Sequence, residues 1–115
     1  MHELSIAMSI VDLAQEELER RGSAQVERVY LRLGILSGVV KEVLLASYEM
    51  ACLATPLEGS RLMIEEIPVE AFCPKCQGPR RVRSIQLFCC PDCGTPTTAI
   101  LRGKELEVFA MEIRE

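Results

Sequence analysis

Two Cys-x-x-Cys pairs constrain this chain more than any other feature of its sequence. Cys73 and Cys76 form the first pair, Cys90 and Cys93 form the second, and thirteen residues, 77–89, separate them. A tight turn inside each pair aims both sulfurs at one ion, and this ribbon spacing suits a tetrahedral site. We therefore expect four thiolates to bind one structural zinc ion, with no open position for catalysis.

The fifth cysteine of this segment leaves one ligand position open. Cys89 stands next to Cys90 and could replace it, with a less regular gap of three residues before Cys93. The Pro91 and Gly94 positions match a rubredoxin-like knuckle, in which a glycine permits the turn, so they favour Cys90. Cys89 is otherwise a small side chain on a ribbon strand, and the sixth cysteine, at position 52, is expected to be a helix-buried thiol.

Composition and charge bound the class of protein. The chain has 115 residues, with 49% hydrophobic and 26% charged, which predicts a globular core or a small core plus a metal-held appendage. Its net charge of -4 argues against general nucleic-acid binding. The Arg80, Arg81 and Arg83 cluster is interpreted as a solvated hairpin face or a patch for an acidic protein, with nucleic acid as the alternative.

The amino terminus bears on the cellular compartment. It lacks the basic region of a secretory signal, and no apolar run approaches the length of a membrane span. We expect a cytoplasmic protein without a membrane partner. A reducing compartment favours thiolate ligands over disulfides.

Hydrophobic periodicity predicts two helices. One extends from Leu4 to Leu18 and is stopped by Gly22, and the other ends before Thr55 and Pro56. The apolar positions are Leu4, Ala7, Val11, Ala14 and Leu18 in the first helix, and Val43, Leu44, Ser47, Tyr48, Met50 and Ala51 in the second.

Alternating residues predict three strands. These lie at 25–33, at 61–67, where Pro68 breaks the ladder, and after Gly103. The expected faces are Val29, Leu31 and Leu33 against Arg28, Tyr30 and Arg32; Leu62 and Ile64 against Met63 and Glu65; and Phe109, Met111 and Ile113 against Leu106, Val108 and Ala110.

Together these elements predict an α+β fold. Two helices pack on a small three-stranded sheet, and a rubredoxin-like zinc-ribbon domain is inserted into it. We place the domain boundaries so that residues 1–70 plus 103–115 form the α+β domain and residues 71–102 form the zinc-binding domain.

The only histidine, His2, follows a free amine. An amine, backbone amides and an imidazole can form fused chelate rings around one ion, and such nitrogen-rich planar sites suit Ni(II) or Cu(II). A bulky second residue is expected to protect Met1 from removal. The simpler interpretation is that His2 is an exposed end residue, but a helix that starts at once reduces the ordering cost of metal binding.

Motifs along the whole chain resemble one known family. They are Met1-His2-Glu3-Leu4-Ser5, Leu33-Gly34, Leu36-Ser37-Gly38, Thr55-Pro56-Leu57-Glu58-Gly59, Gly103-Lys104-Glu105-Leu106 and the cysteine pairs. With these residues the chain resembles the HypA/HybF hydrogenase nickel-incorporation proteins.

The resemblance implies a nickel metallochaperone and not an enzyme. The Met1 amine, the His2 side chain and amide, and the Glu3 backbone would form a labile nickel site, while the cysteines hold structural zinc. Family members deliver Ni(II) to the large subunit of [NiFe] hydrogenase with the maturation GTPase HypB, and some also support urease maturation. A homodimer is possible.

The chain departs from the family at two places. Ile35 stands where a Glu commonly follows Gly34, and Val40-Lys41 stands where a carboxylate can assist nickel, with Glu42 as the nearest substitute. These departures question a fifth nickel ligand and part of the GTPase contact but leave the terminal nitrogen set intact. The competing hypothesis is a zinc-ribbon adaptor for nucleic acid or a protein. An enzyme has little support, because the chain lacks a nucleophile motif.

Overall fold

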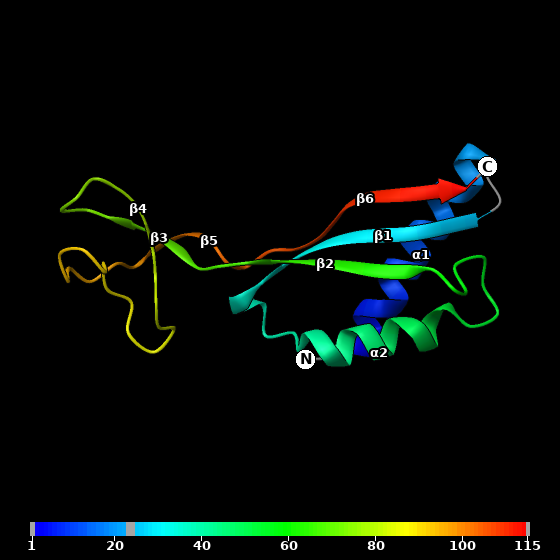
Figure 1. Cartoon of the computed structure of the whole chain (residues 1–115), viewed down its shortest axis with the longest axis horizontal. Coiled ribbons are helices and arrows are strands. Elements are labelled where there is room, and N and C mark those ends of the chain that lie inside the picture. The colour runs from blue at the N-terminus through cyan, green and yellow to red at the C-terminus, as the bar shows by residue number, and fades with distance from the viewer. Residues whose placement is uncertain (1, 23–24, 115) are drawn as a thin grey trace. The chain divides into compact units, whose positions relative to one another are not determined.

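The computed structural model describes residues 2–22 and 25–114, which fold as two compact units. The first unit consists of residues 1–32, 39–65 and 107–115, and the second of residues 33–38 and 66–106. The elements, in chain order (Figure 1), are α1 (Glu3–Arg21), β1 (Gln25–Gly34), a 3-10 helix (Ile35–Ser37), α2 (Lys41–Cys52), β2 (Arg61–Ile67), β3 (Glu70–Cys73), β4 (Gly78–Arg81), β5 (Ala99–Arg102) and β6 (Leu106–Arg114).

The first helix ends as its sequence predicts. Gly22 adopts the left-handed conformation, with φ of 65°, and its N–H donates to the Glu19 carbonyl at 3.3 Å. The prediction that Leu4 belongs to the buried face is wrong, because Leu4 is 46% exposed and Ile10 is buried. The residues that α1 buries are Ala7, Ile10, Val11, Ala14 and Leu18.

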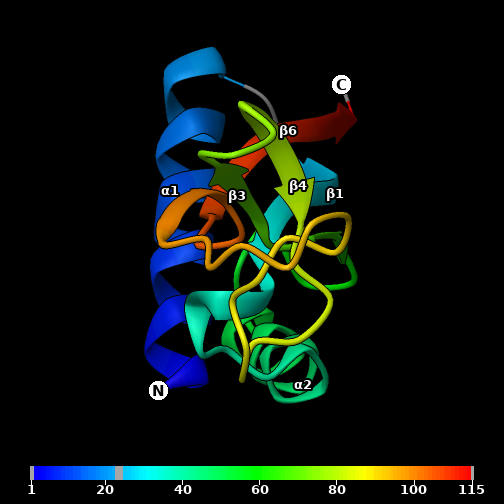
Figure 2. The ribbon, with the colours of Figure 1, turned by 90° about the vertical axis from the view of Figure 1, so that its left-hand side faces the viewer.

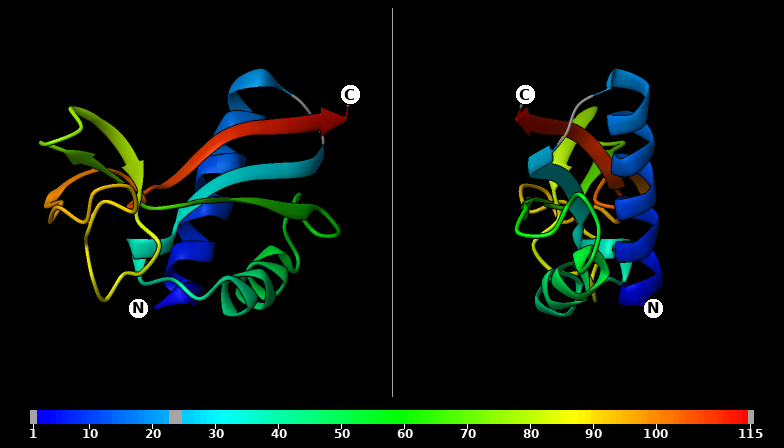
Figure 3. Two further views of the ribbon diagram at one scale, coloured as in Figure 1. Left: turned by 60° about the vertical axis from the view of Figure 1, so that its left-hand side comes forward. Right: turned by 90° about the vertical axis from the view of Figure 1, so that its right-hand side faces the viewer.

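The sheet of the first unit has the strand order β2-β1-β6, so the C-terminal strand joins the first sheet as predicted (Figure 1). Both helices cover one face of this sheet (Figure 3). Val29 and Leu31 of β1 are buried in the core beneath the helices, whereas Tyr30 and Arg32 lie on the opposite face with the side chains of β6. The alternation predicted for this strand is therefore confirmed.

The alternation predicted for β6 is wrong. Val108, Met111 and Ile113 pack against the core, whereas Phe109 lies on the other face with the Arg32 guanidinium 4.0 Å from its ring centroid. The facing of the side chains thus shifts by one residue between Val108 and Met111. Such an irregularity is tolerated at a sheet edge, where a strand is paired on one side only.

The second helix buries fewer of its apolar residues than its spacing predicts. Leu44 and Tyr48 are buried, but Val43 is exposed and Met50 is 64% exposed. Cys52 is buried at the end of α2, its Sγ 3.9 Å from the Ser60 hydroxyl, so the expected buried helix thiol is confirmed.

A second three-stranded sheet, of order β4-β3-β5, builds the second unit (Figure 2), where a zinc ribbon was predicted without strand bounds. Its small core consists of Val69, Ala71 and Val82, with Leu36, Phe88 and Ile100 packed against it. Leu36 comes from the 3-10 helix, whose chain is tied to this unit because the Leu36 N–H donates to the Gly103 carbonyl at 2.7 Å.

The predicted boundaries, between residues 70 and 71 and between residues 102 and 103, divide the chain into an α+β domain and a zinc-binding domain. This division stays a prediction. Among the described residues, no helix is long and apolar enough to cross a membrane.

We predict that Gly34→Ala destabilises the protein more than Gly78→Ala. A Cβ at Gly34 would lie 2.2 Å from the Gly103 carbonyl oxygen, which is backbone and cannot move aside, so we expect a loss of about 1–3 kcal/mol. A Cβ at Gly78 would meet only the flexible end of Arg80, at 3.2 Å. Urea unfolding of the zinc-loaded variants measures both, and equal losses would contradict the close packing at Gly34.

Candidate metal centres

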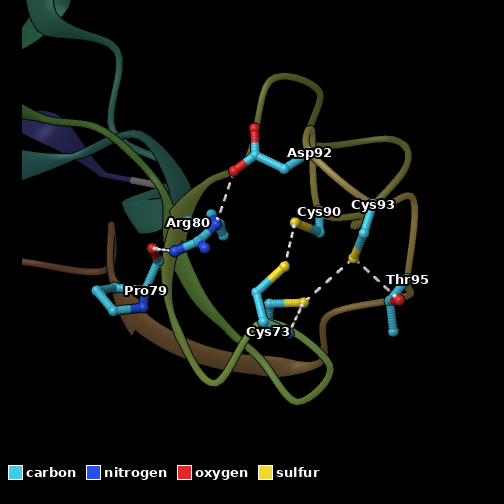
Figure 4. A network of polar contacts seen from close by, with 8 residues as sticks. Cys73, Pro79, Arg80, Cys90, Asp92, Cys93 and Thr95 are labelled. Atoms are coloured by element: carbon cyan, nitrogen blue, oxygen red, sulfur yellow. Dashed lines mark hydrogen bonds and ion pairs between the residues drawn. The ribbon is translucent and has the colours of Figure 1, made fainter.

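The four cysteines of the two pairs lie together. Their sulfur atoms all fall within 4.8 Å of one another, with Cys73 and Cys93 Sγ 3.6 Å apart and Cys76 and Cys90 Sγ 4.0 Å apart (Figure 4). A tetrahedron with Zn–S bonds of about 2.3 Å has edges of about 3.8 Å. Both sulfur-to-sulfur distances therefore fit four thiolates around one zinc ion.

The two pairs are built as the same turn. The Gln77 N–H donates to the Cys73 carbonyl and the Gly94 N–H donates to the Cys90 carbonyl, each at 2.8 Å. Both donors have a left-handed backbone, with φ of 55° at Gln77 and 76° at Gly94. The residue after each pair therefore turns the chain back, which favours glycine and which Gln77 adopts despite its Cβ.

Two of the four thiols favour opposite protonation states when no cation is bound. The Thr95 hydroxyl lies 3.1 Å from Cys93 Sγ and lowers the pKa of Cys93 to about 6. Hydrogen bonds to Cys93 and then to Cys73 raise the pKa of Cys76 to about 12. Cys76 is therefore held as a thiol, chiefly by its hydrogen bonds to the neighbouring sulfurs. A divalent cation favours the thiolate at every position, so this donor set suits a metal.

The structure separates Cys89 from the cluster. The backbone of Cys89 forms an isolated antiparallel β-bridge with Pro96, and the Cys89 N–H donates to the Leu87 carbonyl at 3.0 Å. Cys90, its neighbour, is buried among the four sulfurs. This arrangement supports Cys90 as the ligand, and the ligand assignment itself stays a prediction.

An ion pair that sequence reasoning missed connects the second knuckle to β4. Asp92 stands in the sequence between the two cysteines of the second pair. Arg80 Nε lies 2.8 Å from Asp92 Oδ2, although the N–H is not aligned for a hydrogen bond (Figure 4). Arg80 also donates to the Pro79 carbonyl at 2.8 Å. Opposite charges on the two segments were the available signal, but only the fold brings them together. Arg80 is therefore paired with Asp92, whereas no ion pair of Arg81 or Arg83 is found among the described residues.

The predicted nickel residues lie at the start of α1. Met1 lies outside the described residues. His2 is exposed and precedes the helix, and its carbonyl accepts the Ile6 N–H at 3.2 Å. The Glu3 carboxylate accepts the Val40 N–H at 3.0 Å, and this hydrogen bond lowers the pKa of Glu3. The side chain of Glu3 is therefore tied to the residue that precedes α2.

The position that can carry a carboxylate in the family is apolar here. Val40 directly precedes α2 and is exposed, and Glu42 lies exposed in the first turn of that helix. Among the described residues, the only set of three or more metal-ligating side chains that lie together is the cysteine cluster. The described residues therefore place no such cluster of ligating side chains around His2.

We predict that Cys90→Ser reduces the zinc content below one per chain, whereas Cys89→Ser leaves it at one. The first change removes a sulfur from the cluster and the second removes a thiol outside it. Zinc analysis after gel filtration of both variants measures this. Loss of zinc from Cys89→Ser alone would make Cys89 the ligand and exclude Cys90.

We also predict that strong chelators unfold residues 71–102 before the rest of the chain. Structural zinc in small sites contributes roughly 10–16 kcal/mol of apparent binding free energy, which a small apolar core cannot replace. Hydrogen exchange after chelation should show lost protection in β3 and β4 first. Simultaneous loss in α1 would show that one cooperative unit depends on the metal.

Comparisons with known proteins match the chain from end to end. The family model described as hydrogenase/urease nickel incorporation, metallochaperone, hypA matches residues 1–113. A hydrogenase maturation factor HypA of Roseiflexus sp. (strain RS-1) is 44% identical over 115 residues, covering 100% of this chain and 94% of the relative. A hydrogenase maturation factor HybF of Klebsiella pneumoniae is 36% identical over 112 residues, covering 97% of this chain and 98% of the relative.

Two solved structures share the fold. The solution structure of the Ni metallochaperone HypA from Helicobacter pylori superposes with a TM-score of 0.67, covering 98% of this chain and 97% of that one. A second structure, described as HypA protein, has a TM-score of 0.73 and covers 99% and 97%. Both are 23% identical to this chain, so their likeness concerns the fold.

Proposed function

Because the chain belongs to the HypA family of nickel-incorporation metallochaperones, we propose that it binds Ni(II) at its amino terminus and delivers the ion to the large subunit of a [NiFe] hydrogenase. It is a nickel metallochaperone and hydrogenase maturation factor. The proposal concerns which atoms hold the cargo and which protein receives it. The Met1 amine, the His2 imidazole and amide, and the Glu3 backbone are the proposed nickel ligands.

The observation that carries the ligand proposal is that α1 begins at Glu3, directly after His2. The first N–H groups of a helix have no intrahelical acceptor, so the amides of His2 and Glu3 can release their protons to solvent and bind Ni(II) through nitrogen without breaking a helical hydrogen bond. The bond between the Glu3 carboxylate and Val40 holds this terminus against the fold and reduces the ordering cost.

The same position accounts for a labile site. The helix macrodipole places partial positive charge at its N-terminus, which opposes a bound cation by about 0.3–1 kcal/mol. The Glu3 carboxylate is engaged with Val40, so it supports the site from the side and is not counted as a ligand. A nitrogen set with this weak opposition suits cargo that must be released.

The cysteine cluster has a structural role in this proposal. Cys73, Cys76, Cys90 and Cys93 would hold zinc, and four thiolates leave no coordination position for nickel or water. The family consists of metallochaperones and maturation factors, and the absence of catalysis by this chain stays a prediction.

The proposed partners follow from the maturation role. They are the GTPase HypB, the hydrogenase large subunit and, in organisms that have them, urease maturation proteins, with a homodimer as a possible assembly. The adaptor alternative is not favoured, because the family match covers residues 1–113 and names nickel incorporation.

We predict that His2→Ala abolishes stoichiometric Ni(II) binding while zinc stays at one per chain. The change removes the imidazole and leaves the cysteine cluster untouched. Calorimetric nickel titration of untagged protein, with zinc analysis of the same samples, measures both. An uncleaved N-terminal tag should also weaken nickel binding, because it blocks the Met1 amine.

Glu42→Gln is the matched control for this experiment. It changes an exposed group near the same helix ends and should leave the nickel affinity within about threefold, since an exposed charge interacts weakly over a distance. Nickel uptake by His2→Ala equal to that of the wild type would refute the terminal site. A large loss in Glu42→Gln would instead make this carboxylate a ligand.

A further inference from the structure

We propose that a groove of the second unit binds an acidic segment of a partner protein, with two carboxylates of that segment held by Arg81 and Arg83. The groove has a volume of about 600 Å³ and lies where the chain leaves β4. All of its lining residues belong to the second unit. They are Ile35, Pro68, Val69, Arg81, Val82, Arg83, Ser84, Ile85 and Gln86.

Backbone contacts hold the groove in shape. The Val82 N–H donates to the Val69 carbonyl at 2.9 Å, which fixes the chain after β4 against the sheet. The Ser84 hydroxyl accepts the Gln86 N–H at 3.2 Å and so closes the turn that follows. A preformed wall reduces the ordering cost of binding a partner.

The two arginines are placed to act as a pair. Val82 between them is buried, so Arg81 and Arg83 both point away from the core. In extended chain, residues two apart are separated by about 6.6 Å. An extended partner with acidic residues at alternate positions has the same spacing and can meet both guanidinium groups.

These arginines are also free to bind. Across the part of the chain that the structure describes, no carboxylate pairs with Arg81 or Arg83, whereas Arg80 faces Asp92. Arginine is favoured at protein interfaces because its planar fork matches carboxylates. Two unpaired arginines beside a groove are therefore available to a partner.

The apolar part of the groove points to a polypeptide. Ile35 is 51% exposed and Ile85 is 54% exposed, and both line the groove. Large apolar side chains beside unpaired charges are typical of protein interfaces. A partner segment with an apolar residue next to its carboxylates would cover them.

Charge segregation favours an acidic protein over nucleic acid. Residues 33–38 and 66–106 contain six Lys and Arg against four Asp and Glu, and Zn(II) with four thiolates adds -2, so the zinc-loaded second unit is neutral by formal charge. The remaining residues carry a formal charge of -6. A long polyanion would be repelled by the acidic unit, and two free arginines neutralise few phosphates. A short acidic segment needs to contact only Arg81 and Arg83.

The test uses the zinc-loaded full chain and a labelled extended peptide with two glutamates at alternate positions beside leucines. Fluorescence anisotropy compares this peptide with the same peptide carrying glutamines. We expect the acidic peptide to bind at least about tenfold more tightly, because two ion pairs and their steering act together. Raising the salt concentration should weaken its binding.

Charge reversal locates the site. Arg81→Glu/Arg83→Glu should weaken the acidic peptide by about tenfold or more and should instead bind a lysine version of the peptide. The control Arg61→Glu/Lys104→Glu makes the same change in net charge outside the groove and should alter binding by less than about threefold. Zinc content and circular dichroism check that each variant folds.

Four outcomes would overturn the proposal. The first is equal affinity for the glutamate and glutamine peptides, and the second is an equal loss in both double variants. The third is an oligonucleotide that binds through Arg81 and Arg83 more tightly than the peptide. The fourth is a dimer in light scattering that Arg81→Glu/Arg83→Glu dissociates, because a second copy would then occupy the groove. The test needs no nickel, so its result is separate from that of the terminal site.

Discussion

The second unit depends on the cluster of four cysteine sulfurs. Its apolar core contains few buried residues, Val69, Ala71 and Val82, and its strands are only four residues long. So little buried apolar surface cannot offset the ordering entropy of such a segment. Bringing four thiolates within 4.8 Å is also unfavourable without a cation. A metal therefore links the charge balance of the cluster to the folding of the unit.

The two proposed metal sites solve opposite physical problems. Zinc, enclosed by thiolates at the ends of two fixed turns, is retained because its release would cost the fold of a unit. Nickel at a helix N-terminus would be bound by terminal groups, so its release would not disrupt the tertiary structure. In the proposed assignment, the cysteine cluster holds a permanent ion and the amino terminus holds the exchangeable cargo.

The errors of sequence reasoning share a physical cause. Periodicity reports which residues are apolar and how they are spaced, but it does not report how many neighbours cover them. Met50 fits the helical spacing of α2 and is exposed, because only one face of this helix meets the sheet. Phe109 fits the alternation of β6 but lies opposite Met111, because an edge strand can shift its facing where a partner is missing.

By itself, the sequence determined the elements that local chemistry controls. Gly22 stops α1, Pro68 follows the end of β2, and Cys-x-x-Cys spacing with Gly94 dictates a metal knuckle, because each depends on residues within one turn. Only the tertiary structure decided what distant segments meet. It brought the two cysteine pairs within reach, excluded Cys89 from the cluster and left Arg81 and Arg83 unpaired beside a groove. The spacing of the cysteine pairs predicted their meeting, but the pairing of Arg80 with Asp92 and the groove join residues that no local pattern relates.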